Sequence, residues 1–433
     1  MNRRFDPAGP LRGTLVPPAD KSISHRAALF AAMSDEPVTV SNYLRSDDTE
    51  STLAAIRALG AGIEERPSND LVIRGVGLHT PAEVTGGVLD VGNAGTLLRI
   101  LPGWLAGQPG GVWTLDGDES IRRRPVARVA EPLRLLGAEV DTVEGGTPPM
   151  TVIGAELEGI DYALPVASAQ VKSAVLIAGL LANGETTVTE PSQSRDHTER
   201  ILARARVPFG RDGLTMTVSQ VDELELDAVE VPGDPSSAAF HVAAACIVPG
   251  SRIVIEHLCL NWTRSAFLRI AQRMGAVIVG EIEDPNEPLV DREPIGELDV
   301  AAAPLVATTV EPEEVPLAID ELPLVGLLGC FADGETVVRG AEELRHKESD
   351  RIAGVVEGLR GLGADIEATP DGFAVRGTGG LRGGSFEARG DHRLAMLGAV
   401  AGLASTEGVE VVGMDAASVS YPQFEGDLRK LIG

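Results

Sequence analysis

The chain repeats one arrangement six times, and this repeat constrains its fold more than any other feature. In each copy a β-like segment ends in a short polar motif, an apolar helix-like run follows, and a second strand then begins. The six motifs are DKSISHR from Asp20, GNAGTLLR from Gly92, SAQVKSA from Ser168, DPSSAAF from Asp234, DELPLV from Asp320 and DHRLAM from Asp391. The second strands are expected to begin near Val38, Val112, Glu185, Arg252, Glu335 and Val409. Each unit therefore contains a strand, a helix, a strand, a helix and a hairpin, which predicts an α/β fold with mixed sheets.

The sixth copy lacks a strand that the other copies have, and a matching segment stands at the other end of the chain. LRGTLVPPADKS from Leu11 resembles LRGGSFEARGDHR from Leu381. We therefore expect the repeat to be circularly closed, with the first strand belonging to the last unit. Turn residues at Asn69-Asp70 and at Pro370-Asp371-Gly372 predict hairpins in the first and fifth units.

The length of the chain and its prolines predict two domains. A chain of 433 residues is too long for one hydrophobic core. Proline-rich segments divide the repeats three and three, so we expect one domain over 18–232, a second over 1–17 plus 233–433, and a two-strand hinge near 17–20 and 231–235. The helices after the motifs are apolar on all sides, which predicts that they are buried. Three such helices per domain, parallel and wrapped by mixed sheets, would make an inside-out α/β barrel.

The composition excludes several classes of function. A net charge of −27 argues against nucleic acid or an anionic membrane as a partner. Cys246, Cys259 and Cys330 stand far apart without CxxC spacing, which is typical of buried thiols in a reducing cytoplasm. No apolar run is long enough for a membrane span, and no secretory signal follows Arg3-Arg4. No cluster of His, Cys and carboxylate residues has metal-ligand spacing and no dinucleotide loop is present, so we expect no metal and no cofactor.

The polar motifs all precede the buried helices, and a helix N-terminus favours anions through its free N–H groups and its dipole. Cations recur in these motif regions although the chain as a whole is acidic. They are Lys21, Arg26, Arg99, Arg124, Arg195, Lys347, Arg351 and Arg393. This recurrence predicts a binding site for a multiply charged anion.

Each motif alone also has a plain structural interpretation. Ser22 could be only a helix N-cap, and so could Asp320. His197 in RDHTER from Arg195 is a tempting base, although a hydrogen-bonded structural histidine is the more frequent case. RHKESDR from Arg345 could be no more than a salt-bridged helix.

Taken together and in order, the strings DKSISHR, GNAGT, RRRP, SAQVK, RDHTER, ELRHKESDR, DHR and YPQF resemble the 5-enolpyruvylshikimate-3-phosphate synthase family, and SAQVK with RDHTER its second sequence class. The resemblance implies a two-domain fold with three βαβαββ units per domain. It also implies the reaction: the 5-hydroxyl of shikimate 3-phosphate attacks C2 of phosphoenolpyruvate, C3 gains a proton, and a tetrahedral intermediate in the cleft between the domains loses phosphate. The partners would be these two substrates alone, and the protein a cytoplasmic monomer.

The resemblance also implies roles for individual residues. The shikimate 3-phosphate site would comprise Lys21, Ser22, Arg26, Ser168, Ala169, Gln170, Arg195, Asp320 and Lys347. The phosphoenolpyruvate site would comprise Lys21, Asn93, Gly95, Arg124, Gln170, Arg351 and Arg393. Asp320 would accept the proton of the 5-hydroxyl, and Glu348, with Lys347 or Lys21, would handle the proton at C3. Lys21, Asp320 and Glu348 are thus the expected catalytic residues.

The chain departs from the family pattern at three places. Ala169 replaces a serine, Glu343 replaces an asparagine near the substrate ring, and the tail ASVSYPQF lacks a lysine that some members direct at phosphoenolpyruvate. Gly95 matters for glyphosate, a phosphonate that competes with phosphoenolpyruvate in this family. Tolerant members of the same sequence class carry alanine there, so class membership alone would predict tolerance, whereas the glycine, which leaves room for the inhibitor, predicts sensitivity.

Two alternatives stay open at the level of sequence. The enolpyruvyl transferase of cell-wall synthesis acts on a UDP-sugar and shares the fold, but its mobile loop carries a cysteine, whereas 115–125 here has none. A non-catalytic anion-binding relative would have lost Lys21, Asp320 or Glu348, and all three are present.

Overall fold

The computed structural model describes residues 1–79 and 87–432, and the chain divides into two compact units. Unit 1 comprises Met1–Pro18, Pro232–Glu287 and Pro294–Gly433, and unit 2 comprises Ala19–Val231 and Pro288–Glu293. The chain therefore passes between the units within both proline-rich segments. The short segment Pro288–Glu293 also belongs to unit 2, although the residues on both sides of it belong to unit 1, and the sequence does not predict this.

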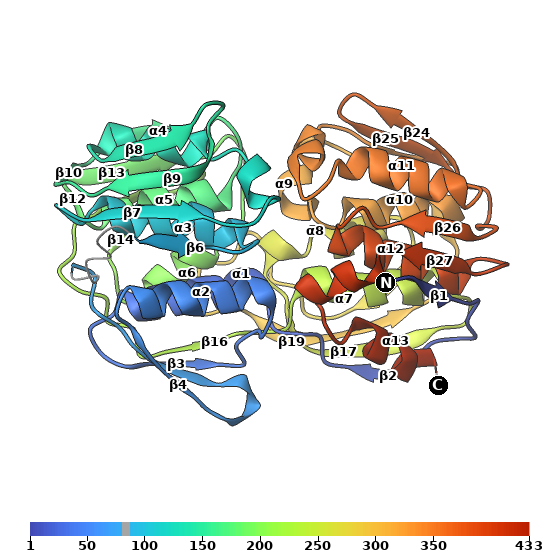
Figure 1. Cartoon of the computed structure of the whole chain (residues 1–433). Helices are drawn as coiled ribbons and strands as arrows, with labels where there is room; N and C mark the ends of the chain where they lie inside the picture. The colour runs from blue at the N-terminus through green and yellow to red at the C-terminus, as the bar shows by residue number, and fades with distance from the viewer. Residues whose placement is uncertain (80–86, 433) are drawn as a thin grey trace. The chain divides into compact units, whose positions relative to one another are not determined.

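Unit 2 holds the first three repeats (blue to green in Figure 1). Its helices are α1 (Lys21–Ala32), α2 (Asp47–Ala58), η1 (Pro67–Asn69), α3 (Gly95–Ala106), η2 (Ile121–Arg123), α4 (Ala127–Leu136), α5 (Ala169–Gly179) and α6 (His197–Arg204). Its strands are β3 (Val38–Ser41), β4 (Gly62–Glu65), β5 (Leu71–Arg74), β6 (Val88–Asp90), β7 (Val112–Asp116), β8 (Glu139–Val143), β9 (Thr147–Ile153), β10 (Leu157–Glu158), β11 (Asp161–Ala163), β12 (Ala182–Asn183), β13 (Glu185–Thr189), β14 (Phe209–Asp212), β15 (Thr215–Ser219) and β16 (Ala228–Glu230).

Unit 1 holds the last three repeats and the N-terminal strands. Its helices are α7 (Pro235–Ile247), η3 (Trp262–Arg264), α8 (Ala266–Arg273), α9 (Val315–Ala318), α10 (Leu322–Phe331), η4 (Glu342–His346), α11 (Arg351–Gly361), α12 (His392–Ala404), η5 (Met414–Val419) and α13 (Phe424–Ile432). Its strands are β1 (Arg3–Phe5), β2 (Arg12–Leu15), β17 (Arg252–Cys259), β18 (Val277–Val279), β19 (Ile295–Ala301), β20 (Leu305–Val306), β21 (Thr309–Val310), β22 (Ala332–Asp333), β23 (Glu335–Val338), β24 (Asp365–Thr369), β25 (Gly372–Arg376), β26 (Gly384–Glu387) and β27 (Val409–Val412).

Each repeat forms a small mixed sheet of its own. The strand orders are β16-β3-β5-β4, β6-β7-β9-β8 and β11-β13-β15-β14 in unit 2, and β18-β19-β17-β2, β21-β23-β25-β24 and β1-β27-β26 in unit 1. In each of these six sheets two strands pair in parallel and the remaining strands pair antiparallel. The second strands begin at Val38, Val112, Glu185, Arg252, Glu335 and Val409, as predicted. The predicted six-fold repeat with mixed sheets is therefore confirmed.

The expectation for the strand that follows Leu11 is wrong. This strand, β2, pairs in parallel with β17 and so completes the fourth sheet rather than the last. The last sheet instead receives β1, which pairs antiparallel with β27. In the same way β16, which follows the third repeat, pairs in parallel with β3 and completes the first sheet. In each unit, a strand next to the point where the chain passes to the other unit therefore completes a sheet. This strand is β16 in unit 2 and β2 in unit 1.

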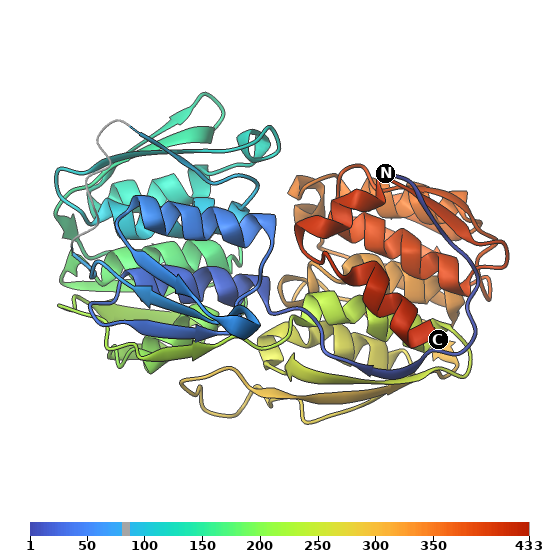
Figure 2. The same ribbon diagram turned by 60° about the horizontal axis from the view of Figure 1, so that its bottom comes forward.

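The cores of both units are built from helices that are buried on all sides. In unit 2, α3 contacts both α1 and α5, and in unit 1, α7, α10 and α12 contact one another. Within each unit the views in Figures 1 and 2 show these helices alongside one another, with strands outside them. The packing of α3 on α5 requires a glycine, because a Cβ on Gly103 would lie 2.2 Å from the carbonyl oxygen of Ala174. The predicted helical core is confirmed in each unit.

Three properties of the described residues complete the fold. No helix within 1–79 and 87–432 is long and apolar enough to cross a membrane. Cys246, Cys259 and Cys330 are buried and form no disulfide among the described residues, and burial raises the pKa of Cys246 and Cys330 to about 12. These two thiols are therefore uncharged at neutral pH and unreactive as nucleophiles.

Candidate active site

The cations of the motifs form two sets, one in each unit. In unit 2 the first of them begins α1. Asp20 caps this helix, since its Oδ1 accepts a hydrogen bond of 2.9 Å from the N–H of Ile23. The interpretation of Ser22 as the N-cap is therefore wrong, and Ser22 is the second residue of the helix. Lys21 Nζ donates to Asp48 Oδ2 at 2.8 Å, and only 20 % of the Lys21 side chain is exposed.

Arg26 lies one turn further along α1 and is almost completely buried, at 2 % exposure. Its guanidinium donates to Thr198 Oγ1 at 2.9 Å, to Ser173 Oγ at 3.0 Å and to the carbonyl oxygen of Ser22 at 3.1 Å. All three acceptors are uncharged, and Arg26 forms no ion pair within the described part of the chain. Burial lowers its pKa to about 10, and the nearby charge of Arg195 acts in the same direction. A buried cation without a counter-ion is ready to receive an anion.

The GNAGT turn places Gly95 at the first position of α3, where no side chain caps the helix. Arg124 Nη2 donates to Asn93 Oδ1 at 3.0 Å, and Asn93 Nδ2 donates to Asp118 Oδ2 at 2.7 Å. A Cβ on Gly95 would lie 2.6 Å from Arg124 Nη1 and 3.3 Å from Arg99 Nη1. The glycine therefore lets two guanidinium groups approach the start of the helix.

The SAQ segment joins this turn to the third repeat. Ser168 caps α5 by accepting from the N–H of Val171 at 3.4 Å. Gln170 accepts from Arg99 Nη1 at 3.1 Å and donates to Thr96 Oγ1 at 3.0 Å. The structure thus brings together Asn93, Gly95, Arg124 and Gln170, four of the residues expected around phosphoenolpyruvate.

His197, the first residue of α6, has a structural role. It is fully buried, and its Nδ1 lies 2.7 Å from Oε1 of Glu293. Glu293 belongs to Pro288–Glu293, the segment that joins unit 2 from a distant part of the sequence. The prediction of a hydrogen-bonded structural histidine is confirmed.

The second set, in unit 1, is centred on Arg351 at the start of α11. Its Nη1 donates to Asp320 Oδ1 at 3.2 Å, its Nη2 to Glu348 Oε2 at 2.6 Å, and its Nε to Asp391 Oδ2 at 2.8 Å. Burial alone would lower the pKa of Arg351, but the three carboxylates outweigh it and raise the pKa. The two expected proton-transfer groups, Asp320 and Glu348, are therefore held on one cation.

Asp320 is not the N-cap of α10, because Glu321 occupies that position. RHKESDR is not a continuous helix either, since η4 ends at His346 and α11 begins at Arg351. Lys347 and Glu348 lie in the turn between them. Burial lowers the pKa of Lys347, although the charge of Asp320 opposes the shift. A lysine with a lowered pKa is better suited to proton transfer than an exposed one.

Arg393 completes the set from the start of α12 and is 9 % exposed. Its Nη2 lies 3.6 Å from Asp320 Oδ2 and its Nη1 lies 3.8 Å from Glu321 Oε1, both beyond hydrogen-bond distance. Its buried Nε has no hydrogen-bond partner among the described residues. Arg393 therefore keeps donors available for an anionic ligand.

Several residues that support these groups were not predicted from the sequence. They are Asp48, Thr96, Asp118, Ser173, Thr198 and Asp391, with Arg99 noted as a cation but given no role. The signal that could have identified Asp48 and Asp391 is their position at the start of a helix within one repeat. No comparable sequence feature identifies the hydroxyl residues Thr96, Ser173 and Thr198.

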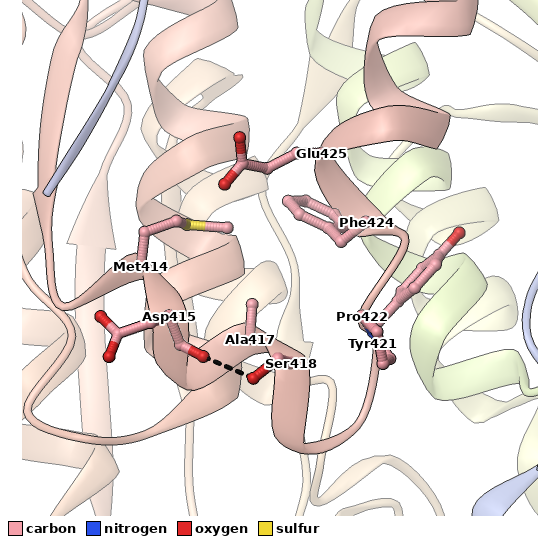
Figure 3. A pocket seen from close by; sticks show the side chains of 8 residues that line it. All are labelled: Met414, Asp415, Ala417, Ser418, Tyr421, Pro422, Phe424 and Glu425. Atoms are coloured by element: carbon pink, nitrogen blue, oxygen red, sulfur yellow. Dashed lines mark hydrogen bonds between the residues drawn. The ribbon is translucent and has the colours of Figure 1, made fainter. Parts of the chain in front are cut away.

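The tail ASVSYPQF forms the end of η5 and the start of α13. These elements line a cavity of about 140 Å³, and its walls include Met414, Tyr421 and Phe424 (Figure 3). Its charged lining residues, among those described, are the carboxylates of Asp415 and Glu425. The cavity does not suit an anionic substrate.

Comparison with known proteins places the whole chain in one group. The family model for EPSP synthase (3-phosphoshikimate 1-carboxyvinyltransferase) matches residues 5–428. The 3-phosphoshikimate 1-carboxyvinyltransferase of Methylococcus capsulatus is 45 % identical over 99 % of this chain and 96 % of its own length. That of Gloeobacter violaceus is 46 % identical over 98 % of each chain. The solved structure of EPSP synthase from Acinetobacter baumannii superimposes with a TM-score of 0.86 at 37 % identity and covers 99 % of this chain and 98 % of that one.

Proposed function

The chain belongs to the EPSP synthase (3-phosphoshikimate 1-carboxyvinyltransferase) family, and from this premise we propose which of its residues carry the reaction. The enzyme transfers the enolpyruvyl group of phosphoenolpyruvate to the 5-hydroxyl of shikimate 3-phosphate and releases phosphate. The new bond joins the hydroxyl oxygen to C2, while C3 gains a proton. In the second half of the reaction C3 loses a proton and the C2–phosphate bond breaks.

Shikimate 3-phosphate is bound by the nine residues expected for it, with Asp320 and Lys347 among them. Arg26 and Arg195 supply the charge for the phosphate, and Lys21, Ser22, Ser168, Ala169 and Gln170 supply helix N-termini and further donors. The proposal is supported by the burial of Arg26 and by its uncharged partners. An arriving dianion would replace the repulsion between Arg26 and Arg195 with two attractions.

Phosphoenolpyruvate is bound by Lys21, which the two substrates share, and by Asn93, Gly95, Arg124, Gln170, Arg351 and Arg393. Arginine suits this task because its planar fork of donors matches a carboxylate or a phosphate. The unpartnered Nε of Arg393 supports its assignment.

Asp320 accepts the proton of the 5-hydroxyl, and Glu348 with Lys347 or Lys21 transfers the proton at C3. The observation that carries this assignment is that Arg351 holds both carboxylates, at 3.2 Å and 2.6 Å. Two acid–base groups that share one cation lie close to one another, which supports their acting on neighbouring atoms of one substrate complex. We also propose that the enzyme is a cytoplasmic monomer without a cofactor.

Phosphate release by the purified protein tests the proposal. We expect release only when shikimate 3-phosphate and phosphoenolpyruvate are supplied together. Release with a UDP-sugar as the acceptor would instead favour the cell-wall transferase activity. Binding of both substrates without turnover would indicate a non-catalytic relative.

A further inference from the structure

We propose that Lys172 is a positioning residue that keeps Arg26 and Arg195 in place for the phosphate of shikimate 3-phosphate, and that keeps the charge of Arg26 available to it. The inference rests on the proposed function, in which these two arginines bind that phosphate. Lys172 lies on α5, and its side chain is 1 % exposed. Its Nζ lies 2.7 Å from Oε2 of Glu190 and 2.6 Å from Oε1 of Glu199. Glu190 is connected with Arg195 and Glu199 with Arg26, in each case through neighbouring residues.

The first connection leads from Glu190 to Arg195. The second oxygen of Glu190, Oε1, accepts a hydrogen bond from the hydroxyl of Ser194, and Ser194 directly precedes Arg195 in the chain. Glu190 and Ser194 are buried. The Lys172–Glu190 pair therefore anchors the loop that presents Arg195 at the start of α6.

The second connection leads from Glu199 to Arg26. Lys172 and Glu199 are the chain neighbours of Ser173 and Thr198, the two hydroxyl residues that accept from Arg26. Ser173 Oγ and Thr198 Oγ1 are 2.6 Å apart, and Ser173 Oγ also donates to the carbonyl oxygen of Ala169 in the SAQ segment. The ion pair between Lys172 and Glu199 thus sets the spacing of α5 and α6 where the two helices hold Arg26.

Charge gives Lys172 a second effect on Arg26. Glu199 raises the pKa of Arg26 and thereby partly offsets the lowering by burial, so its carboxylate lies close enough to attract the guanidinium. Burial raises the pKa of Glu199 itself, and the charge of Lys172 opposes that shift. Without Lys172, Glu199 would lose the cation with which it forms an ion pair, and its charge would act on Arg26, whose pKa it already raises. An Arg26 paired with Glu199 would attract the substrate phosphate less.

Steady-state kinetics of four variants test the proposal. Lys172→Met should raise the KM for shikimate 3-phosphate about tenfold or more, and should change the KM for phosphoenolpyruvate much less. Glu199→Gln leaves the Lys172–Glu190 pair intact but breaks the ion pair between α5 and α6, so it should raise the KM for shikimate 3-phosphate less than Lys172→Met does. The double variant Lys172→Met with Glu199→Gln removes the carboxylate that would compete for Arg26 but restores neither ion pair, so it should recover only part of the lost affinity. Leu176→Ala is the matched control, because Leu176 lies one turn further along the same helix and is fully buried. It should lower the melting temperature without changing the KM for one substrate more than the KM for the other.

The outcomes that contradict the inference are distinct from those that contradict the proposed function. Equal effects of Lys172→Met on both substrates, or no recovery in the double variant, would mean that Lys172 is only structural. A parallel measurement on Arg26→Lys distinguishes a failure of the inference about Lys172 from a failure of the proposed phosphate site. If that variant binds shikimate 3-phosphate like the wild type, the phosphate site itself is misassigned; if it loses affinity while Lys172→Met does not, the phosphate site stands and the role of Lys172 is wrong.

Discussion

Arg351 donates a hydrogen bond of 2.8 Å from its Nε to Oδ2 of Asp391, the residue that caps α12. Asp391 is fully buried and also accepts from Ser349 Oγ and from the backbone N–H of Arg393. One carboxylate therefore fixes both arginines of the unit 1 set, one through its side chain and the other through its backbone.

The first prediction is that Asp391→Asn destabilises the protein in a pH-dependent way. Burial alone would raise the pKa of Asp391, but Arg351 outweighs it and holds the pKa below its usual value. The stabilisation is therefore complete above about pH 4, the value for an unfolded aspartate, and is lost as the pH falls through the lower pKa of the folded state. Removing one partner of a buried pair should lower the free energy of unfolding by about 3–5 kcal/mol at neutral pH. Urea unfolding from pH 7 to pH 3 measures this, and the difference from the wild type should shrink with acidity.

Asp350→Asn is the control for this experiment, because Asp350 also caps a helix but pairs with Arg345 at the surface. Asp350→Asn should lower the free energy of unfolding by no more than about 1 kcal/mol. An equal loss in both variants would show that the buried pair with Arg351 does not explain the effect, since asparagine also caps a helix.

The second prediction is that Asp320→Asn and Glu348→Gln each abolish most of the turnover but keep the fold. Both groups are assigned to proton transfer, which typically contributes about 10²- to 10⁴-fold. Arg351 would retain the other two carboxylates in either variant, so the melting temperature should fall only slightly. Rates of phosphate release beside thermal unfolding curves provide the test, and turnover within about tenfold of the wild type in both variants would refute the assignment.

The third prediction is that Arg393→Met raises the KM for phosphoenolpyruvate by about tenfold or more, because a buried charge-assisted contact is lost. The KM for shikimate 3-phosphate should change much less. Arg376→Met is the control, since Arg376 pairs with Glu335 on the surface and its side chain is 69 % exposed. An unchanged KM for phosphoenolpyruvate in Arg393→Met would remove Arg393 from the binding site.

The fourth prediction is that glyphosate inhibits the wild-type enzyme, and that Gly95→Ala reduces the inhibition more than it reduces affinity for phosphoenolpyruvate. The added Cβ would lie 2.6 Å from Arg124 Nη1, so the guanidinium must move away from the start of α3. An inhibitor longer than the substrate tolerates the loss of this space less well. Inhibition constants for both proteins measure the effect.

Gly426→Ala, where a Cβ meets nothing within 4 Å, is the control and should leave inhibition unchanged. Wild-type resistance to millimolar glyphosate would show that Gly95 does not determine sensitivity.

The sequence by itself determined the repeated elements and the residues at which they begin. The six second strands start at the predicted residues, and the helices that are apolar on all sides are buried. These features are local: hydrophobic periodicity, turn residues and caps act within a few residues of one another, so one copy of the repeat predicts the others. The cations at the helix starts could be identified for the same reason.

Only the tertiary structure decided which elements and side chains are partners. LRGTL at Leu11 and LRGGSF at Leu381 are so alike that their sequences cannot specify the sheet that each joins, and β2 pairs with β17 through backbone hydrogen bonds that any sequence can make. Asp20 and Ser22 are both good N-caps, and the position of the first turn selects Asp20. The Lys172–Glu199 and Lys21–Asp48 pairs are equally hidden in the sequence, because each joins different helices and depends on how closely these pack. Such contacts depend on how whole helices are buried against one another, and no short stretch of the sequence specifies them.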